Sequence, residues 1–173
     1  RSLLISKKNT LWIGNSRGLC KVKLSSIISK DIIIGIGHQQ LSEYGVRAVY
    51  EAKNQDLWMA YGKNRIARYT PSTGQITSID ITPTKQGNNS VVSIIELSTN
   101  EIWLGTVGQG IYVIDPNNNQ VIRRIRHIPS VESSINLDVI GQLLIDSSGL
   151  VWVGTWGAGL NRHNPANGGL RSL

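Results

Sequence analysis

A short motif centred on tryptophan occurs four times along the 173-residue chain. Its tryptophans are separated by 46, 45 and 49 residues. A period of about 40 to 50 residues is typical of stacked repeats, built either from small β-sheets or from helices. The motif reads Leu11-Trp12-Ile13-Gly14, Leu57-Trp58-Met59-Ala60, Ile102-Trp103-Leu104-Gly105 and Val151-Trp152-Val153-Gly154.

The content of each period favours sheets over helices. Short apolar runs, often β-branched, alternate with turn residues, and no run has the 3.6-residue pattern of a helix. The third copy predicts strands at 91–97, 102–106, 111–114 and 121–128. Four antiparallel strands joined by short loops form one blade of a β-propeller.

The predicted fold class is therefore all-β, with four propeller blades in a single segment, 1–173. The repeats are expected at 1–43, 44–89, 90–136 and 137–173. The last copy stops at 170–173, where its outer strand is expected only to begin, and the chain opens on Arg1 rather than Met. We therefore expect a partial propeller cut from a longer protein, its end faces covered by further blades or by another copy of the chain.

Composition excludes several classes of protein. Apolar residues make up 40% of the chain and charged residues 17%, which is too apolar for a disordered chain. The longest apolar run, 32–36, has the length of a strand and cannot span a bilayer. A single cysteine, Cys20, excludes an internal disulfide and a multi-cysteine metal site.

The net charge of +7 raises the question of an anionic partner. The cations are mostly scattered, and the one dense run spans 123–127. Its pattern is typical of a charged outer strand that blocks edge-to-edge pairing, with an anion-binding patch as the alternative. We expect neither nucleic-acid binding nor direct membrane insertion.

The repeats resemble the two-component regulator propeller family. The fourth copy carries most of that pattern, and 133–139 resembles the family's connector between blades. The matching residues are Asp146, Gly149, Val151-Trp152-Val153-Gly154-Thr155, Gly157, Gly159-Leu160, Pro165 and Gly168.

The resemblance implies a role in signal transduction. Such propellers form the extracytoplasmic sensors of bacterial membrane receptors whose output domain is a histidine kinase, a hybrid two-component protein or a diguanylate cyclase. It implies a periplasmic location, a small-molecule ligand such as a carbohydrate fragment, and no catalysis by this segment.

The residues themselves give little sign of catalysis. His38, His127 and His163 are predicted in or near connections between strands, without metal-ligand spacing. Cys20 has no histidine or asparagine partner that the sequence indicates. We expect no catalytic residue, metal or cofactor. Two alternatives stay open: a propeller lyase resembling the streptogramin lyases, which use a histidine with a metal ion, and a structural scaffold for protein partners.

The tryptophans divide into two groups. Trp12, Trp58, Trp103 and Trp152 hold equivalent positions and are predicted to fill the space between neighbouring sheets. Trp156 has no aromatic equivalent and lies in the turn between the second and third strands. That turn is expected on the same propeller face as the connectors between blades, so Trp156 either stacks on a ligand or packs locally.

Other variable residues are predicted on the same face. Structural positions repeat from blade to blade, so positions that vary on one face are candidates for specificity. The candidate ligand-binding residues are Arg17, Arg47, Lys63, Arg65, Gln109, Asn136 and Trp156.

Overall fold

The computed structural model describes residues 2–24, 33–34, 45–62, 64–81 and 90–173. The chain divides into two compact units, Arg1–Asp80 and Ile81–Leu173, each of which is described by itself. The described residues contain strands and turns but no α-helix, and hence no helix able to cross a membrane. The prediction of an all-β chain is confirmed.

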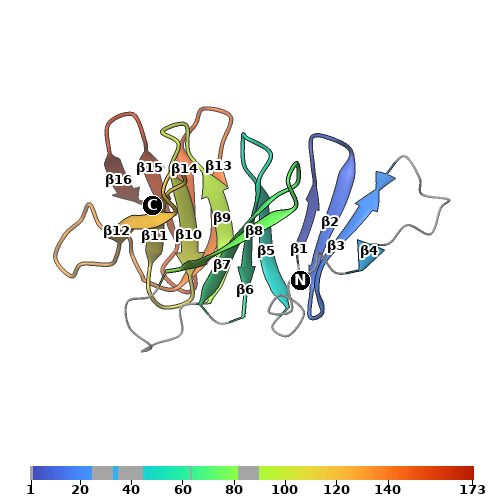
Figure 1. The fold of residues 1–173 in the computed structure, drawn as a ribbon. Coiled ribbons are helices and arrows are strands. Elements are labelled where there is room, and N and C mark those ends of the chain that lie inside the picture. Colours follow the sequence, from blue (N-terminus) through green and yellow to red (C-terminus); the bar gives the residue numbers. More distant parts are fainter. Residues whose placement is uncertain (1, 25–32, 35–44, 63, 82–89) are drawn as a thin grey trace. The chain divides into compact units, whose positions relative to one another are not determined.

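Each unit contains two four-stranded antiparallel sheets with strands in sequence order (Figure 1). We call the sheets blades 1 to 4, and each lies within one predicted repeat. In the first unit, blade 1 comprises β1 (Ser2–Ile5), β2 (Thr10–Asn15), β3 (Gly18–Lys23) and β4 (Ile33–Ile34), and blade 2 comprises β5 (Val46–Glu51), β6 (Leu57–Tyr61), β7 (Arg65–Thr70) and β8 (Gln75–Asp80). In the second unit, blade 3 comprises β9 (Val91–Glu96), β10 (Ile102–Thr106), β11 (Ile111–Asp115) and β12 (Gln120–Ile125), and blade 4 comprises β13 (Ile140–Ile145), β14 (Val151–Thr155), β15 (Leu160–Asn164) and β16 (Gly169–Ser172). The outer strand of blade 4, expected only to begin, is therefore paired along its length as β16.

The first turn of every blade has the same backbone geometry. Its fourth residue has a positive φ, which asparagine and glycine adopt more readily than most residues. These residues are Asn9, Gln55, Asn100 and Gly149. Each donates its backbone N–H to the carbonyl three residues earlier, at distances from 2.9 to 3.1 Å. The short connection fixes the register of the first two strands, and so sets which face of each sheet carries the tryptophan.

A β-bulge recurs near the start of the first strand in blades 2, 3 and 4. The pairing skips one residue in each: Arg47, Val92 and Gly141. A bulge adds a residue to one strand and re-aims the chain locally. Since it falls where the connector enters each blade, it helps to shape that end of the sheet.

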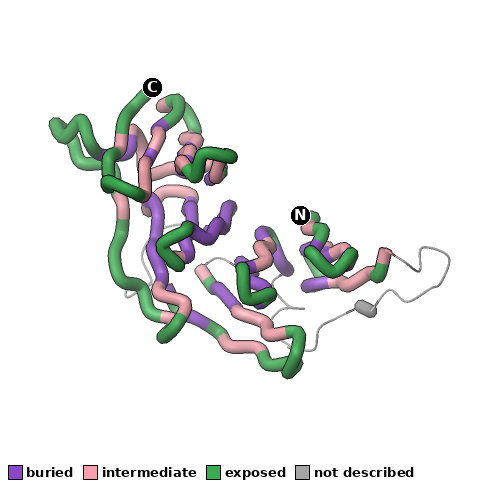
Figure 2. The backbone as a smooth tube through the Cα atoms, turned by 90° about the horizontal axis from the view of Figure 1, so that it is seen from above, coloured by how far each residue is buried: buried purple, intermediate pink, exposed green. Residues whose placement is uncertain are grey.

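Within each unit, the core lies between the two blades. The second strands of blades 2 and 3 are buried along their whole length, whereas β12 is almost entirely exposed (Figure 2). In the first unit Trp12 meets Tyr69 edge-on, with ring centroids 6.1 Å apart. In the second unit Trp103 meets His163 at 5.0 Å. Tyr69 and His163 hold equivalent register positions, so both inter-blade contacts follow one plan.

The tryptophans also hold polar partners on their own blades. The indole N–H of Trp103 donates to Glu101 at 3.0 Å, and that of Trp152 donates to Asp146 at 2.7 Å. Arg123 lies over the Trp103 ring at 5.6 Å and also donates to Glu101. Such pairing allows a charged side chain to lie against a buried ring.

The four motif tryptophans differ in burial. Trp58 and Trp103 have no exposed surface and Trp12 is 3% exposed. Trp152 is only partly buried. The sequence motif is the same, so the difference reflects what covers each ring rather than the local strand.

Candidate functional site

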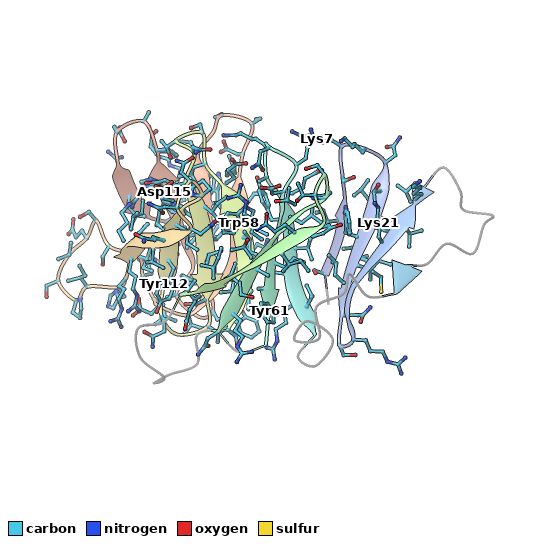
Figure 3. All side chains as sticks on the ribbon, viewed as in Figure 1. Lys7, Lys21, Trp58, Tyr61, Tyr112 and Asp115 are labelled. Carbon is cyan, nitrogen blue, oxygen red and sulfur yellow. The ribbon has the colours of Figure 1, made fainter. Side chains whose placement is uncertain are left out.

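The two ends of each blade carry different kinds of loop. Lys7, in the first turn of blade 1, lies at the upper edge of its unit, and Tyr61, at the end of β6, lies at the lower edge (Figure 3). Within each blade, the turn between the second and third strands lies at the same edge as the start of the first strand and the end of the fourth, because neighbouring strands are antiparallel. We call this edge the connector end.

In the second unit the connector is fixed to both neighbouring turns. Val139 pairs with Val107 of the β10–β11 turn, and its carbonyl accepts the backbone N–H of Trp156 at 2.9 Å. The Asp138 carbonyl accepts the N–H groups of Gly108 and Gly110, at 3.1 and 2.8 Å. The β10–β11 turn, the connector and the β14–β15 turn thus form one continuous backbone layer.

The Asp138 side chain closes the connector on itself. Its carboxylate accepts two hydrogen bonds from Arg126, at 3.0 and 2.8 Å, and one from the backbone N–H of His127, at 2.7 Å. Within the connector, Ser134 Oγ accepts the backbone N–H of Ile128 at 3.1 Å. The connector is therefore a braced support for the surface above it.

Trp156 is the most exposed large apolar side chain of this unit, at 74%. Gly141, the bulge residue of β13, lies directly beneath its ring. A Cβ atom on Gly141 would stand 2.6 Å from two atoms of the indole, closer than real contacts allow. The glycine thus makes room for the ring, which rests on the backbone and presents much of its surface to solvent.

Gln109 and Asn136 lie at the same connector end, where their side chains form hydrogen bonds with neighbouring residues. Gln109 accepts two hydrogen bonds from Arg124, at 2.9 Å to its carbonyl and 2.6 Å to its amide oxygen. Asn136 donates to the Ala158 carbonyl at 2.8 Å and accepts from Ser172. Their polar groups brace the turns around Trp156, whose ring remains exposed.

In the first unit three arginines lie at the connector end. Arg17 is in the β2–β3 turn, Arg47 is the bulge residue of β5, and Arg65 begins β7, and all three are exposed. Gly45, at the end of the connector, packs against the β2–β3 turn, since a Cβ there would meet Ser16 at 2.8 Å. Lys63 lies outside the described residues.

The histidines correct one sequence prediction. His163 is 8% exposed and lies within β15, not in a connection, so its interpretation as a loop residue is wrong. His127 lies in the connector, where its Nδ1 is 2.8 Å from the Ile135 carbonyl. His38 lies outside the described residues. Among the residues that are described, no three His, Cys, Asp or Glu side chains gather as metal ligands would.

Burial and the surrounding charges set the protonation state of His163. Burial lowers the pKa of His163 below its ordinary value and nearby Arg123 lowers it further, while Glu101 and a hydrogen bond with the Gly169 backbone oppose these effects. Burial also resists ionisation of Glu101, but hydrogen bonds from Arg123 and Trp103 outweigh it and lower the pKa of Glu101. The arrangement keeps His163 neutral beside an ionised Glu101, which suits packing rather than catalysis.

Comparison with known proteins gives structural matches only. No family model matches the chain, and no curated protein matches it. One similar structure is the extracellular domain of BT4673 from B. thetaiotaomicron, assigned as a hybrid two-component system. It is 26% identical with a TM-score of 0.76, over 99% of this chain and 24% of that one. The chain thus spans about a quarter of that domain.

Two further matches show the fold alone. Virginiamycin B lyase from Staphylococcus aureus is 16% identical, with a TM-score of 0.71, over 97% of this chain and 53% of the lyase. The WD40 β-propeller domain of Doa1 is 16% identical, with a TM-score of 0.61, over 91% of this chain and 47% of that one. The predicted fold is thus confirmed: the four sheets are blades of the propeller type.

Proposed function

We propose that this chain is part of an extracytoplasmic sensor propeller of a bacterial two-component-type membrane receptor, without catalysis of its own. The observation that carries the proposal is the likeness to the extracellular BT4673 domain over 99% of the chain at 26% identity. The tryptophan repeats that resemble the two-component regulator propellers support it independently. The lyase likeness extends to the fold alone, so no second function is proposed.

The ligand is a small molecule with an apolar face, such as a sugar ring, that stacks on Trp156. An indole that rests on backbone and exposes much of its surface is suited to such stacking. The braced turns around it hold the ring in place before the ligand arrives, which lowers the entropic cost of binding.

A titration with neutral and acidic mono- and disaccharides tests the ligand class. Backbone amide signals of the β14–β15 turn and the connector are followed by NMR in the native chain, in Trp156→Ala and in Ile122→Ala, a control that removes another exposed apolar side chain. We expect Trp156→Ala to weaken binding by about tenfold or more. Because the ring is largely exposed, we expect the variant to remain folded. Binding that survives Trp156→Ala would remove Trp156 from the site.

The location is tested separately from the ligand. An antibody against this chain, used with protease on intact and permeabilised source cells, reports the compartment that the segment occupies. We expect protection to disappear once the outer envelope is opened while the inner membrane is still intact. Protection that persists until the inner membrane is breached would refute the sensor assignment, whatever the sugar titration shows.

A further inference from the structure

Blade 4 contains a cavity at the end opposite Trp156, beside the β15–β16 turn. Its volume is about 280 Å³. It is lined by Arg162 and Asn164 of β15, Asn167 of the turn, and Gly169 and Arg171 of β16. None of these residues is among those described at the connector end.

Two arginines face each other across the strands that form this cavity. Arg162 and Arg171 are direct register partners of β15 and β16. Like charges in directly opposed positions destabilise a sheet unless something neutralises them. Within the described part of the chain neither guanidinium forms an ion pair. The pKa of Asp146 is lowered chiefly by the hydrogen bond from Trp152, and the charge of Arg162 is the last of the effects that lower it.

The amide side chains of the cavity are oriented by the turn. The Asn164 side-chain oxygen accepts the N–H of Ala166 at 3.0 Å, and the Asn167 side-chain oxygen accepts the N–H of Gly169 at 3.0 Å. Both side-chain NH₂ groups are left as donors. The ring of His163 forms a hydrogen bond with the Gly169 backbone.

The cavity therefore offers donors and positive charge, and its lining contains no carboxylate. Guanidinium groups bind planar and tetrahedral oxyanions with paired, charge-assisted hydrogen bonds. We propose that this cavity is an oxyanion site, for a carboxylate, sulfate or phosphate group of a small molecule. The site is separate from the stacking site proposed at Trp156 and does not depend on it.

A comparison within the same unit shows why the arginine pair is unusual. In blade 3 the residues paired side by side at the equivalent positions of β10, β11 and β12 are Trp103, Val113 and Arg123. These positions therefore hold one cation rather than two. That cation is neutralised by Glu101 at 2.7 Å. Blade 4 replaces the valine by Arg162, and the extra charge has no counterpart on its own blade other than Asp146. The anion supplies the missing charge.

The test titrates the chain with sodium sulfate, sodium glucuronate and glucose at constant ionic strength, following arginine Nε–H and backbone amide signals by NMR. We expect saturable shifts confined to Arg162, Arg171 and Gly169 for the two anions and none for glucose. If glucuronate binds more tightly, the natural group is a carboxylate; tighter sulfate indicates a sulfate or phosphate ester. Shifts with glucose that match those with glucuronate would overturn the proposal.

Three variants complete the test. Arg171→Gln should weaken anion binding by about tenfold, since it removes a charged donor from an exposed position. Asn167→Asp keeps the oxygen that caps Gly169 but adds a negative charge, and should abolish binding. Lys7→Gln removes an exposed cation from the first unit and should change nothing. Equal effects of Lys7→Gln and Arg171→Gln would show general charge screening and refute the site.

Discussion

Replacement of Trp103 by alanine is the most direct test of the inter-blade core. The ring has no exposed surface and lies between Arg123 of its own blade and His163 of the next. A buried tryptophan removes about 150 to 250 Å² from water, worth about 4 to 6 kcal/mol at the usual coefficient. Since buried surface gives an upper estimate and mutational series give about 3 to 5 kcal/mol, we expect a loss of 3 to 5 kcal/mol.

The matched control is Trp152→Ala. Both indoles donate their N–H to an acid of the preceding turn, but Trp152 is only partly buried. The difference between the two variants therefore isolates the packing of one blade on the next. We expect Trp152→Ala to cost about 1 to 2 kcal/mol less. Trp103→Phe, which keeps most of the apolar surface and loses the bond to Glu101, should fall between the native chain and Trp103→Ala.

Urea unfolding followed by far-ultraviolet circular dichroism measures these free energies, with a common slope required for comparison. A loss below about 1 kcal/mol for Trp103→Ala would mean that the ring is not a core residue. Equal losses for Trp103→Ala and Trp152→Ala would refute the argument that burial between blades sets the magnitude.

Three further predictions concern other parts of the chain. The unfolding free energy should fall as pH decreases from about 6.5, because the unfolded chain binds a proton at His163 that the folded chain resists; His163→Gln should flatten this slope in urea titrations at a series of pH values. Gly141→Ala should displace the Trp156 ring and alter near-ultraviolet circular dichroism, and an unchanged spectrum would contradict the contact. Alanine at Arg17 or Trp156 should shift the melting temperature by less than about 2 °C while lowering the ligand response of the intact receptor; equal loss of both would indicate packing.

The strands could be predicted from the sequence because the same pattern of apolar and turn residues occurs four times. The motif around Trp103 places apolar residues at regular positions. In three of the four blades the turn before the motif holds an asparagine or glycine at the position of positive φ, as Asn100 and Gly149 show. The connector end of each blade also follows from antiparallel order. These features depend on residues near one another in the chain, so local patterns are enough to indicate them.

Other features depend on what a neighbouring blade covers, which no local pattern reports. His163 lies in the polar stretch Leu160–Asn164, where the sequence gives no sign of burial, yet Trp103 of blade 3 covers it. Trp152 shares the motif of Trp103 but not its burial. The support beneath Trp156 was missed for the same reason, since Gly141 reaches the ring only through a bulge and a paired strand.

The clustering of positive residues along the sequence does not indicate which of them are neutralised in the structure. The dense basic run at 123–127 was one candidate for an anion-binding patch, yet each of its arginines has a partner. Arg123 binds Glu101, Arg124 binds Gln109, and Arg126 binds Asp138. The first two bonds hold the exposed outer strand β12 to the rest of blade 3, and the third closes the connector on itself. Arg162 and Arg171 are nine residues apart in the sequence, and only the pairing of β15 with β16 brings them together. A charge recognises an anion when its own fold leaves it unneutralised, so the sparse pair, rather than the dense run, carries the anion site that we propose.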